Sequence, residues 1–132
     1  MTDTLSITKT EGRVVVLHLR GELTAGTEPE FIRVARELRD GGVDRVLLDM
    51  SGLAMLTSAG LRSLHTALLL FTPREEIDAF QRENPGDIFK SPYFKLAGAN
   101  PQVYSILSMA GFLHNIPFYP DLKQGLDSFG PA

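Results

Sequence analysis

Residues 46–61 read VLLDMSGLAMLTSAGL, and this stretch decides the fold. Its first three residues, 46–48, are apolar and predict a short buried strand, which a turn at residues 51–52 follows. Thr57 and Ser58 come next, and hydroxyl side chains at such a point are typical of the start of a helix. A strand that leads through a turn into a helix is the repeating unit of an α/β domain.

Two further strands are predicted upstream of this unit. Residues 14–19 are apolar, β-branched at several positions and bounded by Gly12 and Gly21, which predicts a mostly buried strand. Residues 5–8 alternate between apolar and polar side chains. Only a short turn at residues 11–12 separates the two segments, so we expect them to pair as a hairpin.

A helix is predicted between the hairpin and residue 46. Residues 27–30 have the spacing of a capping box, and the Pro at position 29 fits the first helical turn. Gly41 and Gly42 mark the end of the helix. Its apolar face repeats at helical intervals and consists of Phe31, Val34, Ala35 and Leu38.

The same alternation continues downstream. Leu61, Leu64 and Leu68 give the second helix its apolar face, and a second capping-box spacing at residues 72–75 predicts a short polar helix after it. The remaining expected elements are a strand at 94–96, a helix that starts at Asn100 and stops at Gly111, an edge strand at 116–119 and a final helix capped by Asp121.

This order of elements predicts a single α/β domain over residues 1–132. We expect a mixed, mostly parallel sheet of four to five strands, packed with about four helices. One compositional break, an insert at about residues 71–93, follows the second helix; it is charged, interrupted by Pro and poor in apolar residues. Loops of this length are usually functional or mobile, so a surface excursion, a role in partner choice and a role in self-association all stay open.

Composition excludes several classes of protein. The chain has no Cys, so disulfides, Cys-based zinc sites, iron–sulfur clusters and thiol catalysis are ruled out. A net charge of −3 gives no electrostatic footprint for nucleic acid and does not favour an anionic membrane. The N-terminus lacks a signal-peptide pattern, and no apolar run approaches the roughly 20 residues of a spanning helix. We therefore expect a soluble, cytoplasmic protein.

Motifs of enzyme chemistry are scarce. His18, His65 and His114 do not share ligand spacing, and the chain has no Gly-rich phosphate loop. The segment around Ser58 lacks the first Gly of a nucleophile elbow, G-x-S-x-G. We expect no catalytic residue, no metal and no cofactor. A small hydrolase would need an acid or a His within hydrogen-bond reach of Ser58.

Ser58 itself has two interpretations. The first is a helix N-cap, whose hydroxyl accepts free main-chain N–H groups, and spacing alone favours it. The second is a phosphorylation site, because a helix N-terminus also stabilises a phosphate, which adds about −1.5 to −2 charges.

Three blocks resemble the STAS domain, the family of bacterial anti-sigma factor antagonists. Residues 16–24, VLHLRGELT, are similar to the family's strand followed by G-E-L-D. Residues 46–61 are similar to its next strand, D-L-S-G and then D-S-x-G-L, and this block is the specific one. Residues 100–112 are similar to the helix and M-S-G-L segment near the family's end.

The resemblance implies a regulatory binding protein rather than an enzyme. In the family, the Ser of D-S-x-G is phosphorylated by a serine kinase that is itself the anti-sigma factor, and a phosphatase reverses this. The unphosphorylated antagonist binds the kinase and frees the sigma factor. The implied switch residue here is Ser58, with Thr57 as the second candidate. The implied partner-binding residues are Glu22, Leu23, Thr24, Thr57, Ser58, Ala59 and Gly60.

Two substitutions depart from the family pattern. Thr57 stands where the family usually has Asp, and Thr24 stands where it often has Asp. Both changes make the implied kinase-facing surface less negative. An alternative is therefore a STAS scaffold or ligand-sensing module that is not phosphorylated. Self-association into a homodimer stays open, and we expect about a third of the apolar residues that flank Ser58 to lie at the surface.

Overall fold

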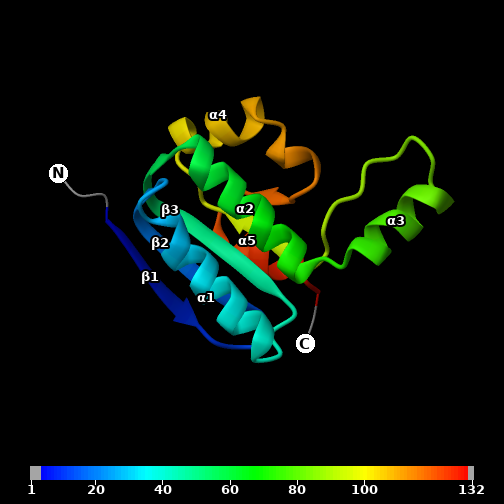
Figure 1. The fold of residues 1–132 in the computed structure, drawn as a ribbon, viewed down its shortest axis with the longest axis horizontal. Coiled ribbons are helices and arrows are strands. Elements are labelled where there is room, and N and C mark those ends of the chain that lie inside the picture. Colours follow the sequence, from blue (N-terminus) through cyan, green and yellow to red (C-terminus); the bar gives the residue numbers. More distant parts are fainter. Residues whose placement is uncertain (1–3, 131–132) are drawn as a thin grey trace.

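A five-stranded sheet lies at the centre of the computed structural model, which describes residues 4–130 (Figure 1). The strands lie in chain order across the sheet. The first pair is antiparallel and the other three pairs are parallel, which confirms the predicted mixed sheet. The strands are β1 (Leu5–Thr10), β2 (Val15–Leu23), β3 (Val46–Leu56), β4 (Phe94–Ala97) and β5 (Phe118–Tyr119).

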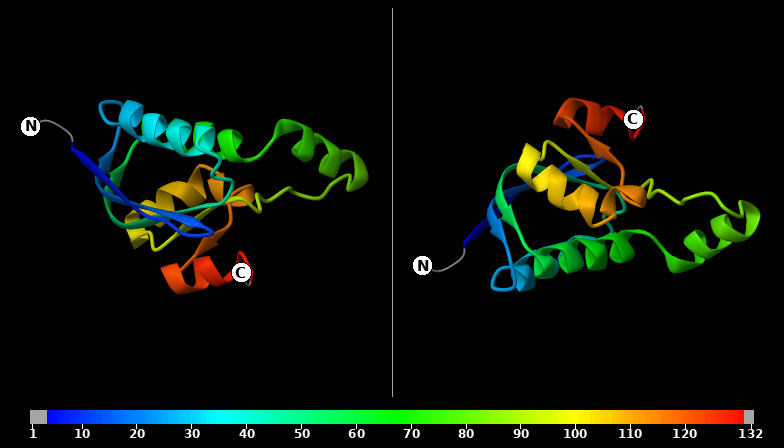
Figure 2. Two further views of the ribbon diagram at one scale, coloured as in Figure 1. Left: turned by 90° about the horizontal axis from the view of Figure 1, so that it is seen from below. Right: turned by 90° about the horizontal axis from the view of Figure 1, so that it is seen from above.

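Helices cover the two faces of the sheet unequally (Figure 2). Three of them share the larger core with the sheet, whereas the last one packs on the opposite face. The order of strands and helices agrees with the prediction. The helices are α1 (Glu28–Asp40), α2 (Ser58–Phe71), α3 (Arg74–Glu83), α4 (Pro101–Met109) and α5 (Leu122–Asp127), with a 3-10 turn, η1, at Phe112–His114.

The larger core lies under α1, α2 and α4. Its side chains come from alternate positions of the strands and from the predicted helix faces, and burial of each large apolar side chain stabilises the fold by about 1.5–3 kcal/mol. Members that are fully buried include Leu17, Leu19, Phe31, Leu48, Leu64, Phe94, Leu96 and Leu107. Of the face predicted for α1, Phe31, Ala35 and Leu38 are buried, and Val34 is half-buried.

The predicted turn at residues 51–52 is wrong, because β3 continues through it to Leu56. Two extra residues on β3 are absorbed by irregularities in its pairing with β2, between His18 and Arg20 and between Gly21 and Glu22. Such bulges let a strand keep its partner while it bends. A Cβ at Gly52 would lie 3.0 Å from the Leu19 oxygen, so Gly marks a close approach of two strands here. The same irregular pairing lets β2 continue past Gly21 to Leu23.

Neither predicted capping box forms. Thr27 is the N-cap of α1, but its side chain makes no capping bond and instead donates to the Glu22 oxygen. Thr72 is buried at the end of α2, where its hydroxyl lies 2.7 Å from that of Ser91. Tertiary hydrogen bonds therefore take both hydroxyls away from the helices that follow them.

The insert forms an arm whose outer part stands away from the sheet (Figures 1 and 2). The short helix predicted there is present as α3, and none of its ten residues is buried. The root of the arm is fixed by the Thr72–Ser91 contact and by a main-chain bond from Ser91 to the Asn115 oxygen. The Phe80 and Phe89 rings contact each other edge-on. The arm is thus an ordered excursion with a buried root.

The opposite face of the sheet is covered at one end only. There α5 packs on Leu47 and Ala97, and a Cβ at Gly125 would lie 2.9 Å from the Leu47 methyl groups. Lys95 is also buried on this side; burial lowers the pKa of its ammonium, which donates to Ser128 and lies over the Phe129 ring. Among the helices of residues 4–130, none has the length and apolar character needed to span a bilayer.

Candidate functional site

Two segments far apart in the sequence meet at the end of the β2–β3 pair. The strands are parallel, and their last paired residues are Leu23 and Leu56. The main-chain N–H of Thr57 donates to the Leu23 oxygen at 3.1 Å, which joins the end of β2 to the start of α2. The structure thus brings residues 22–24 and residues 57–60 together.

Gly60 permits this close junction. A Cβ at residue 60 would lie 2.4 Å from the Leu23 oxygen and 2.8 Å from the Leu56 Cδ1 atom. Carbon atoms cannot approach a main-chain oxygen so closely, so any other residue would push α2 away from β2. The first turn of α2 is therefore seated directly on the main chain of the neighbouring strand.

Thr57, and not Ser58, is the N-cap of α2. Its backbone is extended, and its hydroxyl accepts a hydrogen bond from the Gly60 N–H at 3.4 Å. The same hydroxyl donates to the Leu23 oxygen at 3.5 Å. The N-cap interpretation of Ser58 is accordingly wrong, because Ser58 is the first residue inside the helix.

The side chain of Ser58 is exposed at this helix start. Its hydroxyl has no hydrogen-bond partner anywhere in residues 4–130, and neither a His nor an acid is bonded to it. The positive end of the helix dipole lies at this position, which favours an anion over a cation. The arrangement presents one primary alcohol to the surroundings at a fixed place on the surface.

Four of the predicted site residues are buried. These are Leu23, Thr24, Ala59 and Gly60, whereas Glu22 and Thr57 are half-buried. Thr24 organises the turn into α1: its N–H donates to the Thr27 hydroxyl at 2.9 Å, and its oxygen accepts from the Glu28 N–H at 2.8 Å. The buried members therefore support the loops, whereas Ser58 is exposed and Glu22 is partly accessible.

Of the four apolar residues that flank Ser58, one is exposed, and its side chain is named here the Met55 rim. Met55 is 48% exposed, whereas Leu53 and Leu56 are buried and Leu61 is half-buried. Strict alternation would place Leu53 and Met55 on one face of β3 and Leu56 on the other. The irregular pairing with β2 between Leu53 and Met55 shifts the alternation by one residue, so Leu53 and Leu56 are both buried while Met55 is exposed. The start of α4 also belongs to this end of the sheet, since Asn100 caps α4 and donates to the Leu53 oxygen.

A hydrogen-bonded pair, a half-buried His and a buried Asp, lies further back on the same two strands. His18 Nδ1 is 2.7 Å from Asp49 Oδ2, and His18 Nε2 is 2.9 Å from the Thr10 hydroxyl. Burial alone would raise the pKa of Asp49, but hydrogen bonds from His18 and Ser51 outweigh burial and hold this pKa below its usual value. The structural role predicted for His18 fits these contacts. The contact with Asp49 was not predicted, although the parallel register of two neighbouring strands could have indicated it.

Metal binding has no support from the geometry. Within the described part of the chain, no three His, Asp or Glu side chains come together in a group that could hold a metal ion. The surface around Ser58 therefore offers a hydroxyl, the Glu22 carboxylate and the Met55 side chain. Such a surface is suited to contact with another protein.

Comparisons with known proteins agree with this architecture. A sequence model of the STAS domain matches residues 6–78, which include both loops of the site but not the third similar block. An anti-sigma factor antagonist from Mycobacterium paratuberculosis has a similar structure, with a TM-score of 0.75 and 19% identity over 99% of this chain and 98% of that chain. A search among curated proteins finds no match.

Two structures of SpoIIAA are also similar. The anti-sigma factor antagonist SpoIIAA in its unphosphorylated form gives a TM-score of 0.65 at 14% identity and covers 94% of each chain. The phosphorylated form of the Bacillus cell fate determinant SpoIIAA gives 0.59 at 12% identity, over 94% of this chain and 97% of that chain. At these identities the likeness is one of fold.

Proposed function

The chain belongs to the STAS domain family, and we propose that it is an anti-sigma factor antagonist whose switch is phosphorylation of Ser58. Proteins of this kind are regulatory binding proteins rather than enzymes. The observation that carries the proposal is the exposed Ser58 hydroxyl without a hydrogen-bond partner in residues 4–130, held at the start of α2 where the family has its phosphorylated Ser.

The surroundings of the two neighbouring hydroxyls favour Ser58 over Thr57. Thr57 is half-buried, caps α2 and donates to the Leu23 oxygen, so its phosphorylation would break contacts that seat the helix. Ser58 is exposed and would lose no such bond. A kinase that transfers phosphate to this surface would therefore reach the Ser58 oxygen without disturbing the fold.

A phosphate at Ser58 would change binding through charge. It would add about −1.5 to −2 charges beside the first free N–H groups of α2, where the helix dipole stabilises an anion. Because Thr24 and Thr57 are neutral, Glu22 is the acid of the site, and the phosphate would dominate the local potential. We expect a partner that fits the neutral surface to be repelled by the phosphorylated one.

The proposed partners are an anti-sigma factor that is also a serine kinase, and a phosphatase that removes the phosphate. Both would dock over the accessible parts of the site, which are the exposed Ser58, the half-buried Glu22 and the Met55 rim. The buried residues Leu23, Thr24, Ala59 and Gly60 would act through their support of the loops. Such a cycle acts on transcription and places the protein in the cytoplasm.

A second candidate function rests on the two Thr residues. With Thr24 and Thr57 in place of acids, a kinase that depends on those acids would not recognise the surface, and the domain would serve as an unphosphorylated scaffold or a ligand sensor. In that case, substitution of Ser58 by Asp should leave partner binding unchanged.

Site mapping by mass spectrometry tests the proposal. The protein is incubated with ATP and each anti-sigma factor kinase of its own organism. Wild type and Thr57→Asn should both gain one phosphate on Ser58, because Asn keeps the helix cap but lacks a hydroxyl. Ser58→Ala should gain none. Phosphate on Thr57 would overturn the assignment of the residue, and kinase binding without phosphate on either residue would reject the switch.

A further inference from the structure

The two edges of the sheet are protected to different degrees. At one edge, β5 has only two residues, and Pro117 and Pro120 flank it, so it offers little to another strand. At the other edge, β1 has six residues, no Pro and a single charged residue, Lys9. No strand of residues 4–130 pairs with the outer side of β1. Lys9 is thus the one protective residue of β1, and a six-residue edge whose main-chain groups are exposed is a template for a further strand.

Alternation of the hydrogen bonds defines which groups of β1 face outward. The Glu22 N–H donates to the Thr4 oxygen at 2.8 Å, so residues 4 and 22 are a hydrogen-bonded pair of the antiparallel ladder. Such pairs alternate along the strand, which directs the main chain of residues 6, 8 and 10 toward β2. The N–H and C=O groups of Leu5, Ile7 and Lys9 therefore point away from the sheet.

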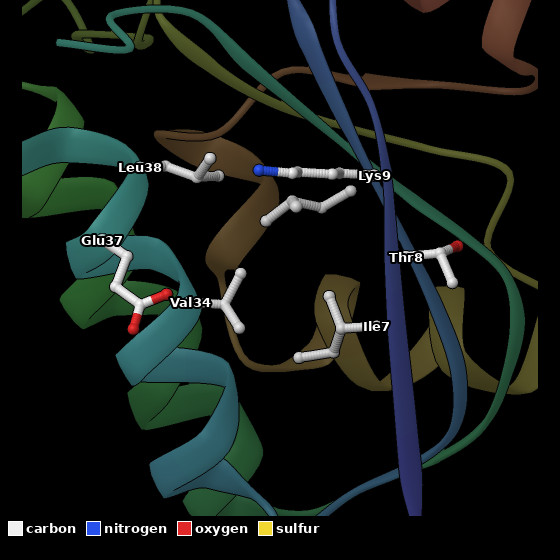
Figure 3. A pocket seen from close by; sticks show the side chains of 7 residues that line it. Ile7, Thr8, Lys9, Val34, Glu37 and Leu38 are labelled. Carbon is white, nitrogen blue, oxygen red and sulfur yellow. The ribbon is translucent and has the colours of Figure 1, made fainter. Parts of the chain in front are cut away.

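The side chains of the same three residues face α1. Ile7 and Lys9 line a groove of about 240 Å³ between β1 and α1, whose other side carries Val34, Glu37 and Leu38. Figure 3 shows Ile7 directed toward Val34, while Thr8 points to the opposite side of the strand. Leu17 also lines this groove and is buried. The edge thus combines outward main-chain groups with a partly open groove, in which apolar side chains lie between the charged ends of Lys9 and Glu37.

We propose that a second copy of this chain pairs antiparallel with β1 about a two-fold axis at Ile7. In this register Ile7 faces Ile7, Leu5 faces Lys9, and Ser6 faces Thr8. Hydrophobic and hydroxyl pairs of this kind stabilise neighbouring strands, and no like charges lie opposite each other. Leu5 and Ile7 of the second copy would cover the open side of the groove.

The sequence of β1 favours its own copy over an unrelated peptide. In a two-fold pairing, both strands use the outward N–H and C=O groups of Leu5, Ile7 and Lys9. The side chains of these residues face α1, where Ile7 and Lys9 line the groove, so one register satisfies the main chain and the side chains together. The Pro-flanked edge at β5 then stops further addition, so the assembly closes as a dimer of two sheets. This inference goes beyond the phosphorylation switch and does not depend on it.

Sedimentation velocity over a range of protein concentrations tests the dimer. Wild type should sediment as a dimer that dissociates on dilution. Lys9→Pro removes one outward N–H and should raise the dimer dissociation constant at least tenfold. The matched variant Lys9→Ala removes the same side chain but keeps the N–H, and should stay within about threefold of wild type; a tenfold change is about 1.4 kcal/mol.

A second variant tests the dimer without introducing a Pro into β1. Ile7→Lys places two ammonium groups opposite each other at the axis and should give a monomer, with far-ultraviolet circular dichroism and urea unfolding to confirm that the domain is folded. A wild-type protein that remains a monomer at several hundred micromolar would overturn the proposal. A dimer that both Lys9→Pro and Ile7→Lys leave intact would also overturn it.

Discussion

The two ends of helix α2 are built in opposite ways. At the first end, Gly60 packs on the main chain of β2 and leaves the Ser58 hydroxyl exposed and without a hydrogen bond in the described structure. At the other end, the Thr72 hydroxyl is buried and bonded to Ser91, and the chain leaves the core in an arm whose helix buries no residue. Burial, rather than residue type, separates a candidate switch hydroxyl from a structural one.

The largest expected effect on stability comes from adding a methyl group at Gly60, at the first end of α2. Gly60→Ala places a methyl group 2.4 Å from the Leu23 oxygen, so α2 must shift. At a solvent-exposed helix position, Gly→Ala would stabilise the helix by roughly 1 kcal/mol. At Gly60 the added methyl group overpacks the junction with β2, so the protein should be destabilised by about 2–3 kcal/mol. Urea unfolding measures the difference. Gly12→Ala, which has its nearest contact at 3.5 Å, should change stability little. Equal effects of the two variants would contradict the close junction.

The contact between His18 and Asp49 makes the stability of the fold depend on pH. Because the pKa of Asp49 is lower in the folded than in the unfolded chain, its ionised form stabilises the fold above the unfolded value of about 3.9. This contribution disappears as the pH falls through the folded pKa.

Asp49→Asn should therefore destabilise the protein by about 1.5–2 kcal/mol at pH 7, the lower part of the range for hydrogen bonds to a charged group. The difference from wild type should shrink as the pH falls from about 3.9 through the lower pKa of Asp49 in the folded protein. Unfolding curves at several pH values measure it. A difference that stays constant over this range would show that the carboxylate charge is not responsible.

Sequence patterns predicted the layers of the fold and the start of α2 better than the end of α2, where the chain enters the arm. The apolar intervals of α1 and α2 and the β-branched runs predicted the layers, because burial of one face dominates the energetics of each element. The predicted turn at residues 51–52 failed because bulges keep a strand paired through residues that otherwise favour turns. The Thr72 capping box failed because the spacing of Thr and Glu does not reveal a buried tertiary partner such as Ser91.

The candidate site was only partly predictable. Similarity to the family indicated the two loops, and the parallel order of β2 and β3 brings them together. Which residues face outward could not be predicted, because Ser58 and Thr57 carry the same chemical group and differ by one position at the helix start. The His18–Asp49 contact depends on strand register, which periodicity alone does not define.

The root of the arm should show an intermediate effect. Thr72→Val keeps the shape of the side chain but removes the buried hydroxyl that contacts Ser91, which should cost about 1 kcal/mol. Thr66→Val on the outer side of the same helix serves as the control and should change stability by a few tenths of that amount. If both variants behave alike, the buried contact does not fix the arm.

The smallest effect is expected within the arm itself. The Glu76 carboxylate accepts hydrogen bonds from the Tyr93 hydroxyl at 3.0 Å and raises the pKa of that hydroxyl above its usual value. Glu76→Gln should lower this pKa toward its usual value and leave the unfolding free energy nearly unchanged. An ultraviolet absorbance titration of the three tyrosines measures the shift. Glu75→Gln is the control, and an equal shift there would contradict the contact.

The central claim is that charge at Ser58 controls partner binding. The most direct measurement is the calorimetric affinity of the anti-sigma factor kinase for wild type, Ser58→Asn and Ser58→Asp. Asn and Asp have nearly the same shape, so only the charge differs between the two variants. We predict that Ser58→Asn binds within about threefold of wild type and that Ser58→Asp binds at least tenfold more weakly, a loss of about 1.4 kcal/mol or more. Equal affinities for the two variants would contradict the switch.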